Sequence, residues 1–124
     1  MARLEHANVT VKDPQATAAL LENLFGWKIR WQGDSIHEGH TVHVGSDESY
    51  LALYAGKVSE TDNSRTYDRV NGLNHLGIVV DDLEETERKV VAAGLEPINH
   101  ADYEPGKRFY FLDEDNLEFE IIEY

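Results

Sequence analysis

The pattern of apolar and polar residues repeats along the chain, and the two copies open with similar segments. One copy begins LEHANVTVKD near the N-terminus, and the other begins LNHLGIVVDD at residue 73. In both segments apolar side chains alternate with polar ones, which is typical of a strand with one buried face. His6 and His75 occupy the same place in the two copies. The repeat predicts two modules of the same design.

A helix is predicted after the first strand of each module. Asp13 is a suitable capping residue, Pro14 suits the first helical position, and Gly26 follows a stripe of apolar residues at helical spacing. The second module repeats these signals at Asp81 or Asp82, over residues 83–93, and at Gly94. Each module therefore contains a helix that can cover one face of a sheet.

Three more strands are predicted after each helix. They comprise residues 27–31, 40–44 and 49–54 in the first module and residues 95–99, 108–112 and 118–124 in the second. The fold class is α+β, with two tandem βαβββ modules at about residues 1–55 and 73–124 and a polar linker at about 56–72. One module cannot bury the apolar face of its own sheet, so we expect a single domain over residues 1–124. Its mixed sheet should curve around a shared cavity.

Strand alternation divides the side chains of each sheet between two faces. The apolar face should lie under the helices and comprises Ala7, Val9, Val11, Leu51, Leu53, Leu76, Ile78, Val80, Phe119 and Ile121. The opposite face carries His6, Asn8, Tyr50, Ala52, Tyr54, His75, Gly77, Glu118 and Glu120. If two such faces come together, they enclose a cavity lined by His6, His75 and Glu120.

Composition narrows the range of partners. The chain has 24 acidic against 11 basic residues, a formal charge of −13, which disfavours nucleic acid and anionic membranes as partners. A neutral or cationic small molecule, or a metal ion, is a better match. The absence of cysteine excludes disulfides, thiolate metal sites and a cysteine nucleophile. No apolar leader or membrane-length run is present, so a cytoplasmic location is expected.

The whole chain resembles the vicinal oxygen chelate superfamily, which includes glyoxalase I, bleomycin-resistance proteins, fosfomycin-resistance enzymes and extradiol dioxygenases. The resemblance rests on the paired modules, on the repeated starts with their histidines, and on FYFLDEDNLEFE near the C-terminus. That last segment is similar to the family's FYFxDPDGxxxE. Glu114 and Asn116 replace the proline and glycine of the motif, and asparagine tolerates the left-handed conformation that such a turn needs.

The resemblance implies a metal site. In metal-binding members the ligands are a His on the first strand and a Glu on the last strand of each module, which correspond to His6, Ala52, His75 and Glu120. Ala52 cannot bind a metal, so three ligands remain. Two imidazoles and one carboxylate favour Fe²⁺ or Mn²⁺, with Zn²⁺ or Ni²⁺ possible, and leave coordination positions open for a substrate.

The resemblance further implies a divalent-metal-dependent enzyme that binds a small substrate through adjacent oxygens, most closely like a dioxygenase. Extradiol dioxygenases and fosfomycin-resistance enzymes share the two-His, one-Glu set, whereas Ala52 removes a candidate base of the glyoxalase I type. Two alternatives stay open: a metal-free, bleomycin-resistance-like binding protein, and a glyoxalase I-like lyase with an altered site. A homodimer is expected, because exposed strand edges favour pairing.

Several other residues are candidates for the cavity wall. Tyr110 corresponds to a tyrosine that contacts substrate in the three-ligand relatives and could donate a proton, although it could also simply pack in the core. His43 is a candidate catalytic histidine from the first module. The predicted substrate-binding residues are Asn8, Tyr50, Tyr54 and Glu118. An anionic substrate would need the cations Arg65, Arg69, Lys107 and Arg108, but we expect these four residues to be solvated loop charges.

Overall fold

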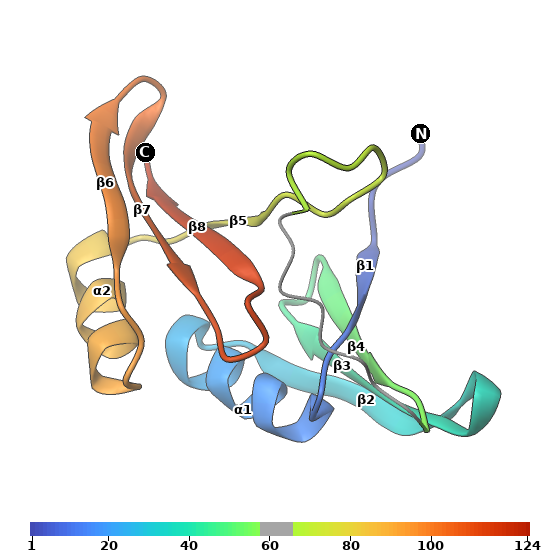
Figure 1. Cartoon of the computed structure of the whole chain (residues 1–124). Helices are drawn as coiled ribbons and strands as arrows, with labels where there is room; N and C mark the ends of the chain where they lie inside the picture. The colour runs from blue at the N-terminus through green and yellow to red at the C-terminus, as the bar shows by residue number, and fades with distance from the viewer. Residues whose placement is uncertain (58–65) are drawn as a thin grey trace. The chain divides into compact units, whose positions relative to one another are not determined.

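The computed structural model describes residues 1–57 and 66–124, and the chain divides into two compact units, Met1–Glu60 and Thr61–Tyr124 (Figure 1). Within the described residues, each unit has one four-stranded mixed sheet and one α-helix. The α+β class and the tandem order of elements are confirmed. The single domain around a shared cavity stays a prediction.

The first unit builds its sheet in the order β1-β4-β3-β2, with β1 parallel to β4 and the other pairs antiparallel. Its elements are β1 (His6–Thr10), α1 (Pro14–Phe25), β2 (Lys28–Ser35), the short 3-10 turn η1 (Ile36–Glu38), β3 (Gly39–Gly45) and β4 (Tyr50–Ala55). As predicted, the Asp13 side chain accepts hydrogen bonds from two backbone N–H groups of the first turn of α1, and Gly26 ends the helix at φ 69°. The helix packs against β3 and β4.

The second unit repeats this topology in the order β5-β8-β7-β6. Its elements are β5 (Leu76–Val79), α2 (Leu83–Ala92), β6 (Ile98–Tyr103), β7 (Gly106–Leu112) and β8 (Glu118–Glu123). Asp82 is the capping residue of α2. In Figure 1, β7 and β8 run side by side, and their register pairs Tyr110 with Glu120. This pairing brings two predicted site residues next to each other on neighbouring strands.

The predicted alternation of faces holds along the central strands. On β4 and β8 the apolar residues assigned to the helix side are buried, namely Leu51, Leu53, Phe119 and Ile121. Phe111 joins them from β7, and its ring stacks on Phe119 with centroids 5.0 Å apart. Glu118 and Glu120 therefore lie on the opposite face of β8, where side chains can serve a site rather than the core.

Two of the strands predicted after the helices differ from their predicted bounds by more than two residues at one or both ends. β2 continues to Ser35 rather than ending at residue 31. β6 starts at Ile98, three residues later than predicted, and continues to Tyr103 rather than ending at residue 99. Both are edge strands whose extra length is polar, so period-two alternation does not reveal it. Their length is set by antiparallel pairing with β3 and β7.

The turn between β7 and β8 supports the strand that carries the candidate carboxylates. Asn116 takes the left-handed conformation with φ 62°, as expected where asparagine replaces glycine. The Asp113 carboxylate accepts hydrogen bonds from the backbone N–H groups of Asp115 and Leu117. Burial raises the pKa of Asp113 above its usual value.

Within the residues that the structure describes, no helix is both long and apolar enough to cross a bilayer.

Candidate metal and substrate site

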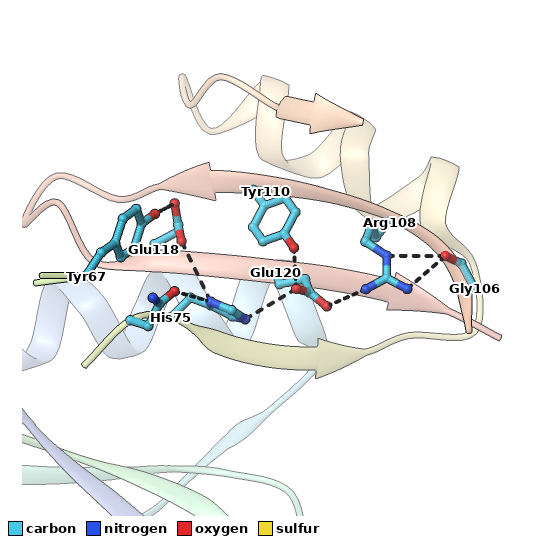
Figure 2. A network of polar contacts seen from close by, with 8 residues as sticks. Tyr67, His75, Gly106, Arg108, Tyr110, Glu118 and Glu120 are labelled. Atoms are coloured by element: carbon cyan, nitrogen blue, oxygen red, sulfur yellow. Dashed lines mark hydrogen bonds and ion pairs between the residues drawn. The ribbon is translucent and has the colours of Figure 1, made fainter. Parts of the chain in front are cut away.

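The second unit gathers five polar side chains on the face of its sheet that points away from the core (Figure 2). Glu118 and Glu120 come from β8, Arg108 and Tyr110 from β7, and His75 from the residue just before β5. The two-residue spacing on each strand places these side chains on one face. Of the residues predicted from the sequence, His75, Tyr110, Glu118 and Glu120 are thus brought together.

His75 and Glu120 face each other directly. The Nε2 atom of His75 lies 3.3 Å from Oε2 of Glu120, and the two side chains are 33% and 13% exposed. Two atoms bound to one divalent ion at about 2.1 Å lie about 3.0 Å apart at neighbouring octahedral corners and about 3.4 Å apart in a tetrahedron. The observed separation fits one edge of either geometry, so this pair suits two ligands of one ion.

Both oxygens of the Glu120 carboxylate have further partners. The Tyr110 hydroxyl donates a hydrogen bond of 2.5 Å to Oε2, and Nη1 of Arg108 donates one of 3.3 Å to Oε1. The Tyr110 ring also meets the His75 ring edge-on at 5.7 Å between centroids. Glu120 is therefore held in a single orientation by three side chains.

Arg108 does not behave as predicted. It lies on β7, within the predicted strand, but it is only 8% exposed rather than solvated. Its Nε and Nη2 atoms donate to the carbonyl oxygen of Gly106, and its guanidinium lies 4.8 Å from the ring centroid of Tyr103. Two-residue spacing from Tyr110 could have placed it on the site face, because the period alone assigns both residues to the same side.

The other three cations that were predicted to be solvated lie in surroundings that differ from those of Arg108. Lys107 forms a half-exposed ion pair with Glu123 at 3.2 Å, and Arg69 is exposed, as expected of surface charges. Arg65 lies outside the described residues. Arg108 is therefore the cation of this set that contacts a predicted site residue in the described part of the chain.

Tyr67 is a site residue that sequence reasoning missed. Its hydroxyl donates a hydrogen bond to Oε1 of Glu118, while Oε2 of Glu118 lies 3.8 Å from Nδ1 of His75. Tyr67 belongs to the predicted linker, whose described part, residues 66–72, forms turns. No local pattern marks Tyr67, because its contact spans 51 positions of the sequence.

The hydrogen bond to Glu120 raises the pKa of Tyr110 to about 12, with burial as the second cause. At neutral pH the phenol therefore stays protonated and acts as a donor. In Glu120→Gln the negative charge is lost, so we expect this pKa to fall towards 10. An NMR pH titration of the tyrosine Cζ resonances measures the change, with Glu123→Gln as a matched control on the same strand. An unaltered Tyr110 titration in Glu120→Gln would contradict the assigned cause.

In the first unit, the aromatic rings of several candidate site residues contact one another in series. The Tyr50 ring lies between contacts to His6 at 4.9 Å and His43 at 4.6 Å, and Trp31 meets His43 at 5.1 Å. The Tyr50 hydroxyl donates to Glu5 at 3.2 Å. Burial and this hydrogen bond raise the pKa of Tyr50. Tyr50 therefore contacts two other predicted site residues, His6 and His43, and Trp31, which was not predicted, contacts His43.

His43 and Tyr110 occupy equivalent positions in the two sheets. His43 pairs with Ala52 across β3 and β4, just as Tyr110 pairs with Glu120 across β7 and β8. Asn8 on β1 also lies in register with Ala52, which is 1% exposed. Burial lowers the pKa of His43, so its imidazole is neutral at pH 7. The first unit thus presents a neutral base where the second presents a phenol.

Tyr54 has its hydroxyl engaged inside the unit. It donates to the carbonyl oxygen of Ile36 at 3.0 Å, and its ring lies so close to Gly39 that a Cβ there would meet ring carbons at 2.3 Å. A side chain at position 39 would therefore require the Tyr54 ring to move. The predicted role of Tyr54 in substrate binding stays a prediction.

The two first-strand histidines are oriented in the same way. In each case the preceding residue places a side-chain oxygen at Nδ1: Glu5 at 2.9 Å for His6 and Asn74 at 2.7 Å for His75. The hydrogen bond with His6 lowers the pKa of Glu5. Ligating histidines usually have their second ring nitrogen fixed in this manner, which leaves Nε2 for the metal.

His75 and Glu120 form a candidate ligand pair rather than a complete site. Across residues 1–57 and 66–124, no three His, Cys, Asp or Glu side chains gather in an arrangement that could hold a metal ion. His6 belongs to the other unit, and its convergence with the pair stays a prediction. The chemistry and the spacing of the pair fit a divalent ion, and Ala52 offers no further ligand.

Comparison with known proteins identifies a family match and several solved structures with a similar fold. The family model for the Glyoxalase/Bleomycin resistance protein/Dioxygenase superfamily matches residues 3–121. No curated protein sequence matches significantly. Among solved structures, a glyoxylase/bleomycin resistance protein/dioxygenase domain from Frankia sp. EAN1pec is similar, with a TM-score of 0.84 at 20% identity over 99% of this chain and 98% of that one.

Two fosfomycin-resistance proteins are also similar in structure. FosX from Listeria monocytogenes, crystallised with Mn(II) and a sulfate ion, has a TM-score of 0.76 at 22% identity over 100% of this chain and 93% of that chain. FosX from Mesorhizobium loti has a TM-score of 0.75 at 22% identity over 98% and 91%. At these identities the likeness concerns the fold, and the family match covers nearly every residue. The chain belongs to the Glyoxalase/Bleomycin resistance protein/Dioxygenase superfamily.

Proposed function

We propose that this protein is a divalent-metal-dependent enzyme whose ion is held by His6, His75 and Glu120 and whose small substrate binds through adjacent oxygens. The observation that carries the proposal is the 3.3 Å separation between Nε2 of His75 and Oε2 of Glu120. That separation suits two neighbouring ligands of one ion. When bound, such an ion is a Lewis acid that polarises the substrate's oxygens.

Tyr110 and Glu118, which lie beside the pair, and His43 of the first unit supply complementary groups. Tyr110 is protonated at neutral pH and is positioned to donate a hydrogen bond or proton beside Glu120. His43 is neutral and can accept a proton. Glu118 is held by Tyr67 and borders His75, which suits a substrate-binding role. Together they offer an acid and a base for chemistry on a polarised substrate.

The favoured reaction class is dioxygenase-like opening of a catechol ring. Two imidazoles and one carboxylate suit Fe²⁺ or Mn²⁺ and leave open positions for a substrate. A relative crystallised with Mn(II), FosX from Listeria monocytogenes, supports the choice of a divalent ion. FosX relatives also make fosfomycin the substrate to test second, after the catechols.

Oxygen consumption tests the reaction class directly. The chain is stripped of metal, reconstituted separately with Fe²⁺ and Mn²⁺, and supplied with a panel of substituted catechols in an oxygen-electrode cell. We expect metal-dependent uptake with at least one catechol, and none with Glu120→Ala. Metal binding without uptake across the whole panel would rule out the dioxygenase class while leaving the metal site in place.

A metal-free binding protein is the second candidate, because one observation favours it. Arg108 already balances the charge of Glu120 through a contact of 3.3 Å between largely buried side chains. A carboxylate neutralised in this way does not need a metal in order to be stable in the fold. If no divalent ion binds above background after reconstitution, this candidate replaces the enzyme.

A further inference from the structure

The Arg108 guanidinium is a buried cation beside a proposed metal ligand. It donates to Oε1 of Glu120 at 3.3 Å, and its side chain is 9% exposed against 13% for Glu120 (Figure 2). We propose that Arg108 is a resident counterion: it holds Glu120 in place without a metal and lowers the affinity of the site for divalent ions. This inference rests on the proposed function, since it concerns the same Glu120.

The local contacts fix the guanidinium where it is. Two of its nitrogen atoms, Nε and Nη2, donate to one carbonyl oxygen, that of Gly106, at 3.3 and 3.2 Å. Its Cζ atom lies 4.8 Å from the ring centroid of Tyr103, within the range of a cation–π contact. If Arg108 turned away, it would lose these contacts and leave the Glu120 carboxylate short of a partner. Arg108 should therefore stay in place when an ion approaches.

A divalent ion bound by Glu120 would lie close to a fixed positive charge. Repulsion between the two cations weakens binding, and it weakens it more here than in water because both Arg108 and Glu120 are largely buried. Loss of the Arg108 hydrogen bond would cost less, since Glu120 keeps its contacts with Tyr110 and His75. The balance of these two effects predicts that removing the positive charge strengthens metal binding.

The test compares Mn²⁺ affinities of the full chain by electron paramagnetic resonance of the free ion. Arg108→Met should bind Mn²⁺ about tenfold more tightly than the natural sequence, or about 1.4 kcal/mol. Arg108→Lys keeps the charge and should stay within about threefold of the natural sequence. Lys107→Met is the matched control, because it removes the same charge from the neighbouring position, where Lys107 pairs with Glu123 instead.

Each outcome has a distinct meaning. Equal or weaker binding by Arg108→Met, with binding intact in the natural sequence, would overturn the counterion role and leave the metal site standing. Absence of Mn²⁺ binding in every variant would overturn both the inference and the proposed function. If Arg108→Met does not fold, as judged by circular dichroism, Arg108→Gln carries the same test, since its amide can still donate to the Gly106 carbonyl.

Discussion

His75→Ala and Glu120→Ala are each expected to weaken Mn²⁺ binding by about a hundredfold or more. Each change removes one of the two proposed ligand atoms, which lie 3.3 Å apart. Changes in residues that merely support a ligand typically cost about 10–100-fold in metal affinity, so loss of a ligand itself should cost at least the upper end of that range. Isothermal titration calorimetry on metal-stripped protein measures the effect.

Two variants serve as controls for the loss of a ligand. His100→Ala removes a half-exposed histidine of the same unit that pairs with Glu87. Glu118→Gln removes a carboxylate two residues from Glu120, on the same face of β8. Both should keep Mn²⁺ affinity within a few-fold of the natural sequence. Metal binding that survives in both His75→Ala and Glu120→Ala would refute the ligand assignment.

Phe119→Ala is expected to lower the free energy of unfolding by about 3–5 kcal/mol, as truncation of a buried Phe usually does. Phe119 is 0% exposed, and its ring stacks on Phe111. The residue lies between Glu118 and Glu120 and points to the opposite face, so its loss removes core packing directly behind the candidate site. Urea denaturation monitored by circular dichroism gives the difference in unfolding free energy.

Val79→Ala provides the comparison for this stability effect. Val79 lies on β5 of the same unit and is 62% exposed, so truncation should change the unfolding free energy by only about 0.5 kcal/mol. A loss in Phe119→Ala no greater than that in Val79→Ala would show that the assigned core is wrong.

The central strands and the caps could be predicted from the sequence because their signals are local. Alternation identified the buried face of β4 and β8, and Asp13 and Gly26 marked both ends of α1. The start of β6 could not be predicted in this way. Its segment from Ile98 to Tyr103 is a polar edge strand, and its pairing with β7 rather than its own periodicity determines where it begins.

Part of the candidate site could likewise be predicted from local signals in the sequence. Parity along the strands placed His75 and Glu120 on one face, and the family resemblance added Tyr110. The structure brings these three side chains together. Arg108 has the parity of Tyr110, but arginine is rarely buried without a partner, so composition alone favoured a surface role. The contact of Tyr67 with Glu118 joins distant parts of the chain and has no local signal.

Anomalous diffraction from crystals grown with Mn²⁺ tests the central claim most directly. The proposed site predicts one strong peak within about 2.2 Å of Nε2 of His6, Nε2 of His75 and a carboxylate oxygen of Glu120. A peak bound by other residues, or saturating Mn²⁺ with no peak at His75 and Glu120, would contradict it.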